Sequence, residues 1–302
     1  MNPGEEAPLE RSLGTPAPAP PAASVAAEPA REARLLDVER VTKRFITSDG
    51  AITAVDDISF SIAPGEFVSI IGPSGCGKST LFNIIGGLVG DYEGRVTVAG
   101  EVVSGTHSAI GMVFQEESTF PWRTVLENVA FPLEISGIGR QERLKRAEHF
   151  VSMVGLSGFG RRFPAELSGG MRQRVALART LASEPRILLM DEPFAALDEQ
   201  TRLLLGDKVL QIQQELKQTT LLITHNLTEA VQLSDRVLVM TYRPGRLKRV
   251  VGIELPHPRD SEVVSSDAFG HYVAEIWHDL REEASRGIRD DESRVLKGGA
   301  KR

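Results

Sequence analysis

Cysteine is almost absent from this sequence, with the single residue Cys76 among 302 residues. One cysteine cannot form a disulfide within the chain, so a disulfide-stabilised secreted fold is excluded and a reducing cytosol is favoured. Cys76 falls at an unspecified position of a Gly-rich loop, where the need for a small side chain explains it better than a redox role does.

Long apolar runs are absent as well. No stretch approaches the roughly 18 apolar residues that a membrane-spanning helix needs. Acidic residues occur early in the chain, at Glu5, Glu6 and Glu10, without an apolar core beside them, which argues against a secretory signal. We therefore expect a cytosolic protein that would work at a membrane only through a partner.

Positive charge is scarce relative to negative charge. The net charge is −6 and the sequence pI is about 5.6, whereas a general nucleic-acid binder is more often basic. Nucleic acid is therefore a disfavoured partner. The hydrophobic content of 41% suffices for a sizeable core, and the length allows one large domain or two smaller ones.

Composition divides the chain into three parts. Residues 1–33 are rich in Pro, Ala and Glu and cannot bury enough apolar surface to offset the entropy of ordering, so we predict a disordered tail. Residues 34–255 hold the motifs described below and form the predicted catalytic domain. Residues 256–302 are a C-terminal extension with an amphipathic helix at about 267–285.

This predicted C-terminal helix carries apolar residues at i, i+3, i+4 and i+7, which places them on one face. The face fits either docking on the helix's own domain or contact with a regulator or a second chain. Its residues are Val273, Ile276, Trp277 and Leu280.

One stretch matches the phosphate-binding loop pattern Gly-x-x-x-x-Gly-Lys-Ser. The apolar run 66–71 before it is typical of a buried strand, and residues 81–85 after it continue as a helix. This is the context that phosphate binding at a helix N-terminus requires. Lys78 would reach the β- and γ-phosphates, and the Ser79 hydroxyl would ligate Mg²⁺. The predicted nucleotide-binding loop is Gly72, Pro73, Ser74, Gly75, Cys76, Gly77, Lys78, Ser79 and Thr80.

Strand patterns alternate with helical patterns after this loop, which predicts an α/β fold with a mostly parallel sheet. The strand patterns before the loop predict an N-terminal antiparallel β subdomain. A helical pattern over 124–154 predicts an inserted helical subdomain at about 116–166. Phe45, near the start of the β subdomain, is suited either to stack on an adenine or to join the core of the antiparallel sheet.

Polar side chains follow three of the predicted strands. Ligands in open α/β sheets bind at such strand ends. Asp191 follows a continuous apolar run and is suited to hold Mg²⁺ through a water, while Glu192 can polarise an attacking water as a general base. Gln115 can ligate Mg²⁺ and touch that water. His225 can hydrogen-bond the γ-phosphate, although a lone strand-end histidine is more often structural.

A second anion site is predicted at the start of another helix. Ser168 is a suitable N-cap, and Gly169 and Gly170 leave backbone N–H groups accessible. Because one loop already wraps a nucleotide, two phosphate-binding elements in one chain favour a head-to-tail homodimer. Each nucleotide would then lie between Lys78 of one chain and Ser168 of the other.

Taken together and in this order, the motifs resemble the ATP-binding subunit of ABC transporters over about residues 34–255. The run Leu-Ser-Gly-Gly at 167–170, followed by Arg-Gln-Arg at 172–174, is peculiar to that family. The resemblance implies a P-loop NTPase core, ATP hydrolysis with Mg²⁺, and a dimer that ATP closes. Met171 and Ala195 depart from the commoner residues, but neither departure removes a phosphate ligand.

The resemblance also implies a role for each motif. Phe45 would be the adenine-stacking aromatic, and the catalytic set would be Glu192, His225 and Gln115. The metal set would be Ser79, Gln115 and Asp191, and the second chain would contribute Ser168, Gly169 and Gly170. In that family the corresponding segments are called Walker A (72–80), Q-loop (Gln115), signature (167–171), Walker B (187–191), D-loop (196–198) and H-loop (His225).

Two further segments, 120–129 and 240–246, resemble the nitrate/sulfonate/taurine branch of importers. That resemblance implies a peripheral protein on the cytoplasmic face of the inner membrane, bound to permease subunits and served indirectly by a periplasmic or extracellular solute-binding protein. A coupling helix of the permease would dock near 116–124, with Trp122 and Phe120 either as anchors or as core residues. The alternatives are an exporter subunit, or an ABC ATPase acting on nucleic acid or the ribosome.

Overall fold

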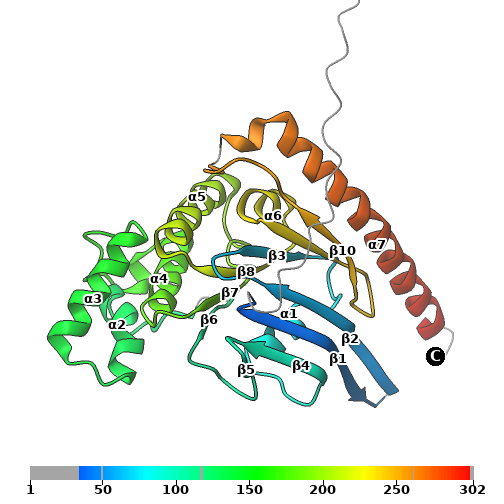
Figure 1. Ribbon diagram of the computed structural model, residues 1–302, viewed down its shortest axis with the longest axis horizontal. Coiled ribbons are helices and arrows are strands. Elements are labelled where there is room, and N and C mark those ends of the chain that lie inside the picture. Colours follow the sequence, from blue (N-terminus) through cyan, green and yellow to red (C-terminus); the bar gives the residue numbers. More distant parts are fainter. Residues whose placement is uncertain (1–33, 49, 116–117, 261, 300–302) are drawn as a thin grey trace, which may run out of the picture.

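The computed structural model describes residues 34–299 apart from 49, 116–117 and 261. The predicted tail and the first residues of the predicted helical subdomain lie outside this range. Two sheets are packed against each other, helices cover the larger sheet, and a helical group lies to one side (Figure 1). The predicted fold class is confirmed: a mostly parallel α/β core with an N-terminal antiparallel sheet and an inserted helical group.

The N-terminal sheet has the order β2-β1-β4-β5, and all its pairings are antiparallel. Alternating apolar residues of β1 and β2 face a core that they share with helix α1 (Lys78–Ile85), which is why these segments form strands with one buried face. The four strands are β1 (Leu36–Thr47), β2 (Gly50–Ile62), β4 (Glu93–Val98) and β5 (Glu101–Val102).

The larger sheet has the order β10-β9-β3-β8-β7-β6, parallel throughout except for the β9–β10 hairpin. Its inner strands β3, β8 and β9 are buried along their whole length, as expected for a parallel sheet covered on both faces. The six strands are β3 (Phe67–Ile71), β6 (Ile110–Val113), β7 (Ile187–Asp191), β8 (Thr219–Thr224), β9 (Arg236–Met240) and β10 (Leu247–Gly252).

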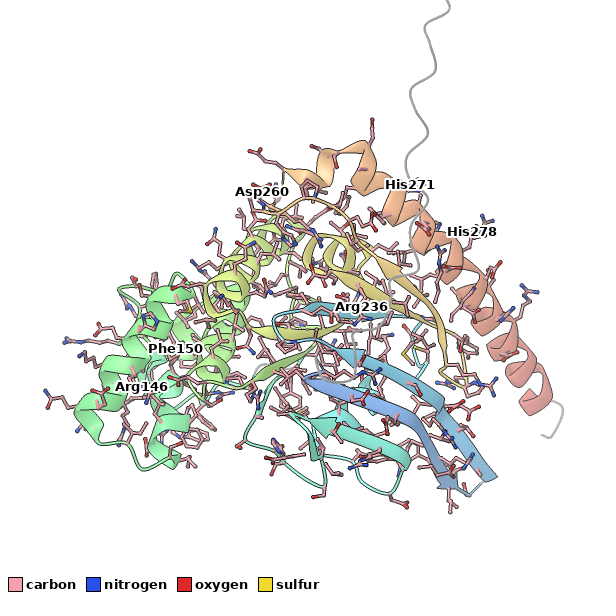
Figure 2. The ribbon with its side chains drawn as sticks, in the orientation of Figure 1. Arg146, Phe150, Arg236, Asp260, His271 and His278 are labelled. Atoms are coloured by element: carbon pink, nitrogen blue, oxygen red, sulfur yellow. The ribbon has the colours of Figure 1, made fainter. Side chains whose placement is uncertain are left out.

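A buried arginine joins the two sheets. Arg236, at the start of β9 and labelled near the middle of Figure 2, donates to the backbone oxygen of Ser61 at 2.6 Å. The same guanidinium pairs with the carboxylate of Glu66 just before β3. Because Ser61 belongs to β2, this one side chain ties the antiparallel sheet to the parallel one.

The helical group contains α2 (Val125–Ile135) and α3 (Arg140–Met153) and packs on α4 (Gly169–Leu181). The predicted helical stretch 124–154 is thus divided in two, because Gly137 in the connection has a φ of 76°, which favours glycine. Thr124 begins α2 with a complete capping box to Glu127. Phe150 points from α3 into the core shared with α4 (Figure 2).

The remaining helices flank the large sheet. They are α1 (Lys78–Ile85), α5 (Glu199–Leu216), α6 (Leu227–Leu233) and α7 (Asp267–Gly299), with single 3₁₀ turns at Pro164–Glu166 and Val263–Ser265. Within the part of the chain that the structure describes, no helix combines the length and apolar character needed to cross a bilayer.

The C-terminal helix α7 runs along the outside of the β9–β10 hairpin and α6 (Figure 1). Of the four residues on the predicted apolar face, Val273, Ile276 and Leu280 pack against the domain, whereas Trp277 is 52% exposed and does not. The packed stripe falls at intervals of three or four residues, and Trp277 lies beyond its edge. The buried residues of this stripe are Phe269, Tyr272, Ile276 and Leu280.

Candidate active site

Four strand ends meet at one edge of the large sheet. Strands β3, β8, β7 and β6 are parallel neighbours, so the segments that leave their carboxyl ends lie side by side. These segments hold the phosphate loop, His225, the Asp191-Glu192 pair and Gln115. The topology therefore brings three sequence-distant motifs to the phosphate loop, as predicted from the apolar runs that precede them.

The phosphate loop enters α1 through Gly77, whose φ is 103°. A residue with a Cβ is strained in this conformation, and the added atom would lie 2.6 Å from the backbone oxygen of Ala54. The chain can therefore turn from β3 into α1 only with glycine at this position. The turn leaves the N-terminal N–H groups of α1 without intrahelical partners, which suits an anion.

Lys78 is folded over the loop that precedes it. Its side chain is buried, and its Nζ donates to the backbone oxygens of Gly72 at 2.8 Å and Pro73 at 3.1 Å. Cys76 is buried beneath the loop with its Sγ 3.9 Å from the same Nζ, and burial raises the pKa of its thiol. The lysine thus holds a positive charge inside the loop, and Cys76 has the packing role expected from the sequence.

Asp191 ends β7 directly beside the loop. Burial raises the pKa of its carboxyl group, and a hydrogen bond from Ser79 and the charge of Lys78 oppose that rise. Its Oδ1 is buried, and no donor among the described residues reaches it. A buried carboxylate oxygen without a partner is costly unless a cation or water satisfies it. Asp191 and the Ser79 hydroxyl therefore form a donor set that fits a hard divalent cation such as Mg²⁺.

Glu192 has a positive φ of 45°, which is unusual for a residue with a long side chain. Its backbone N–H donates to Ile223 of the neighbouring strand at 2.8 Å, which fixes this strained conformation. Its Oε2 lies 3.1 Å from Nδ1 of His225. The pair is thus held at the sheet edge, with the carboxylate facing the phosphate loop.

A cleft of about 420 Å³ lies over the phosphate loop. It contains much of the predicted loop together with Glu192, and two groups that sequence reasoning did not assign to the site: a short stretch of β2 and Arg243. The lining residues are Ile52, Thr53, Ala54, Ser74, Gly75, Gly77, Lys78, Ser79, Thr80, Glu192 and Arg243.

Phe45 lies next to this cleft on β1. It pairs with Ile52 of β2, a cleft residue, and is 41% exposed, so it is not a core residue of the antiparallel sheet. The ammonium group of Lys43 lies 5.1 Å from the centre of its ring. An exposed aromatic face at the rim of a phosphate cleft is suited to stack on a base.

Gln115 stands slightly apart from the other predicted residues. It is exposed two residues beyond the end of β6 and does not line the cleft. The register pairs Val113 with Met190, so Gln115 leaves the sheet at the same edge as Asp191. Its place is therefore the predicted edge, at the side of the site next to β7.

A buried ion pair supports the segment after β8, and sequence reasoning missed it. Glu229 of α6 accepts a hydrogen bond from Thr224 at 2.5 Å and pairs with Arg202 of α5 at 3.2 Å. Arg202 also donates to the backbone oxygen of Leu197 at 2.9 Å. The residues flanking His225 are thus joined to the turn before α5. The only feature of the sequence that could have indicated this ion pair is Glu229, four residues after the strand-end His225.

The second predicted anion site does not join the first within one chain. Ser168 caps α4 by accepting from the N–H of Met171, as expected. Ser168 and Gly170 line a separate hollow of about 480 Å³ beside α5, which shares no residue with the cleft over the phosphate loop. The two predicted anion sites are therefore separate within one chain.

Relatives of known sequence resemble this chain over most of their length. A family model described as ABC transporter matches residues 55–195. An uncharacterised ABC transporter ATP-binding protein of Methanocaldococcus jannaschii is 48% identical, covering 84% of this chain and 94% of the relative. The nitrate import ATP-binding protein NrtD of Synechocystis is 44% identical, covering 73% of this chain and 83% of the relative. The aliphatic sulfonates import ATP-binding protein SsuB of Bacillus cereus is 42% identical, covering 74% of this chain and 88% of the relative.

A solved structure has the same fold. It is a dimeric ATP-binding cassette in a post-hydrolysis state bound to ADP and phosphate, 34% identical to this chain with a TM-score of 0.65. The match covers 73% of this chain and all of the other. The predicted likeness to the nitrate and sulfonate branch is confirmed by the named relatives. This chain belongs to the ABC transporter family and is one of its ATP-hydrolysing ATP-binding subunits.

Proposed function

We propose that this chain is the ATPase subunit of an importer and energises the uptake of a small solute through a membrane permease. The observation that carries the proposal is the sheet edge at which the phosphate loop, Asp191, Glu192 and His225 converge beside a 420 Å³ cleft. Such an edge binds a nucleotide's phosphates and places a base next to them.

In the proposed site, Asp191, Ser79 and Gln115 would hold Mg²⁺, which would neutralise negative charge on the phosphates. Lys78 turns from the carbonyls of its own loop to the β- and γ-phosphates. Glu192 accepts a proton from the attacking water, and His225 orients Glu192 and the γ-phosphate. Phe45 stacks on the adenine at the rim of the cleft.

We infer a head-to-tail homodimer from the separation of the two anion-binding elements. Ser168 and Gly170 line a separate hollow, so this element would reach a nucleotide only in a second chain. The dimeric cassette similar to this chain supports the inference. ATP would favour the closed pair by contacting both chains, because a ligand shifts an equilibrium by its difference in affinity for two states.

The segment 118–124 is proposed to receive the permease. Trp122 is 72% exposed, although its ring lies 5.6 Å from that of Phe120. Phe120 is half-buried against Phe131 and Arg179, so it supports the surface more than it contributes to it. Of the two predicted anchors, Trp122 is therefore the one available to a partner.

The backbone under Trp122 is rigidly held. The fully buried Asn128 accepts from the N–H of Phe120 and donates to the oxygens of Phe120, Arg123 and Thr124, at 2.8 to 3.1 Å. Arg179, on the helix that Ser168 caps, donates to Ser118 at 2.6 Å. Arg179 therefore connects the proposed docking segment directly to the signature helix α4.

The proposed location and solute class follow from the relatives. With a permease as partner, the chain is peripheral on the cytoplasmic face of the inner membrane, and a solute-binding protein contributes only indirectly. Relatives named for sulfonate and nitrate import support a small anionic solute. The ATPase subunit does not contact this solute, so its identity is set by the permease and the binding protein.

Replacing Trp122 by alanine tests the importer assignment. The side chain is exposed and makes few internal contacts, so the isolated chain should keep its fold and ATPase rate within about twofold. Binding to the permease should weaken by at least about tenfold, as for a central interface tryptophan. The measurement is co-purification of the full chain with its tagged permease, together with solute uptake.

The matched control is Phe159→Ala, which removes an exposed aromatic ring elsewhere on the helical group. It should leave co-purification and uptake unchanged. If Trp122→Ala assembled and transported like the native chain, the docking surface would lie elsewhere. If the native chain co-purified with no permease at all, the importer function would be refuted.

A further inference from the structure

The turn between β9 and β10, residues 241–246, lies against the phosphate loop. Gly245 accepts from the N–H of Asp56 and donates to Ala54, both in β2, at 2.9 and 3.0 Å. A Cβ on Gly245 would lie 2.0 Å from the backbone oxygen of Cys76, so only glycine allows this approach. The turn thus packs between β2 and the phosphate loop, next to the cleft.

Arg243, in this turn, places a positive charge in the cleft. Its Nε donates to the backbone oxygen of Gly75 at 2.8 Å, and the side chain is exposed along the cleft wall. Arg246 of the same turn is neutralised by Asp56, whereas no carboxylate among the described residues pairs with Arg243. An arginine fixed beside a phosphate loop, with its Nη groups free of carboxylates, is suited to a phosphate oxygen.

The other side of the turn is held by α7. Glu283 is 1% exposed, and its carboxylate accepts from the backbone N–H of Tyr242 at 2.9 Å and pairs with Lys248 of β10 at 3.1 Å. The ring of Tyr242 is buried, and Gly287 of α7 lies close to it. Glu283 therefore fixes the backbone of Tyr242, the residue directly before Arg243.

Further ion pairs fasten α7 to the hairpin. Lys248 also bonds to the Asp279 backbone oxygen and to Glu282, at 3.0 and 2.8 Å, and Arg249 pairs with Glu275 and Asp279. The outer side of the helix carries His271 and His278 (Figure 2). A short chain of contacts thus runs from α7 through Tyr242 and Arg243 to Gly75 in the phosphate loop.

We propose that Arg243 contacts the phosphate chain of the bound nucleotide, and that α7 positions it for this contact through Glu283 and Tyr242. The inference rests on the nucleotide site proposed above. It assigns the C-terminal helix a role in nucleotide affinity, with Arg243 as the contact residue and Glu283 as a positioning residue.

Arg243→Ala tests the contact. The full chain with Mg²⁺ is titrated with ADP, with the β,γ-imido analogue of ATP and, by competition, with adenosine. Affinity for both nucleotides should fall about tenfold, the effect of losing one charge-assisted hydrogen bond. Adenosine should bind as before, and Arg243→Lys should recover part of the loss. Arg281→Ala, which removes an exposed arginine from α7, is the control and should change nothing.

Two outcomes would overturn this contact. One is nucleotide affinity unchanged in Arg243→Ala, and the other is an equal loss for adenosine, which would mean a general distortion of the cleft. Lys78→Ala separates this inference from the proposed function. If it weakens nucleotide binding and Arg243→Ala does not, only the role of Arg243 fails. If neither variant has an effect, the nucleotide site itself is misplaced.

Glu283→Ala tests the positioning by α7. It should weaken nucleotide binding about threefold in the native background and add nothing in the Arg243→Ala background, because the two residues act in series. Circular dichroism checks that α7 stays helical. Should that variant unfold the helix, Gly287→Ala serves instead, since its Cβ would lie 2.9 Å from the Tyr242 ring and displace it. Unchanged affinity in a folded variant, or an additive loss, would refute the role of α7.

Discussion

Nucleotide affinity is expected to fall by on the order of 10²-fold or more when Lys78 is replaced by alanine. The ammonium group is buried, and it donates to Gly72 and Pro73 within the loop that would wrap the phosphates. Each hydrogen bond from a charged donor contributes about 1.5–3 kcal/mol, and the lysine offers two or more to the β- and γ-phosphates.

Titration with ATP under conditions that prevent turnover measures this loss. Lys145→Ala, which removes an exposed lysine from α3, is the control and should bind ATP like the native chain. Thermal unfolding of the Lys78 variant should show one transition near that of the native chain, since an alanine is compatible with the first turn of α1. Native-like ATP affinity in the variant would remove the phosphate loop from the site.

The second large effect is expected for Glu192→Gln. The glutamine preserves the size, the unusual backbone conformation and a polar contact with His225, but it cannot accept a proton. Loss of a general base lowers turnover by about 10²- to 10⁴-fold. ATP binding should be retained, so the dimer should accumulate in its closed form.

Steady-state hydrolysis and size-exclusion chromatography with ATP measure the two parts of this expectation. Glu215→Gln, an exposed carboxylate on α5, is the matched control and should hydrolyse ATP at the native rate. Near-native turnover in Glu192→Gln would assign the base elsewhere. A variant that is slow but strictly monomeric with ATP would argue against the shared pocket.

Much of the site was readable in the sequence because its parts are local. The phosphate loop is contiguous, and Asp191 and Glu192 follow directly on four apolar residues, a run that is typical of a buried strand. Parallel pairing then brings such strand ends together without further information. His225 was weaker on sequence grounds, and its 3.1 Å contact with Glu192 depends on β8 lying next to β7.

The parts that sequence reasoning missed depend on tertiary contacts. Arg243 and the β2 stretch reach the cleft through a pairing between Val55 and Gly245, which lie far apart in the chain. The buried face of α7 was misread at Trp277, because residues 273, 276, 277 and 280 fit a helical stripe as well as 269, 272, 276 and 280 do. Only packing against the hairpin chooses between the two stripes.

The sequence alone leaves the position of Phe45 open for a related reason. Strand β1 pairs with β2 through several register shifts, and each shift of one residue exchanges the two faces of the strand. Alternation in the sequence could therefore not say whether the ring faces the core or the solvent. The pairing with Ile52 settles this and leaves the ring at the rim of the cleft.

The cleft over the phosphate loop and the hollow lined by Ser168 and Gly170 share no residue. This separation has a genetic consequence for the proposed homodimer. A cell that makes both a Lys78→Ala chain and a Ser168→Arg chain assembles some mixed pairs. In each mixed pair one pocket carries both lesions and the other carries neither. Two alleles that are inactive alone would thus complement each other, whereas a single allele carrying both lesions would never be rescued by its own copies.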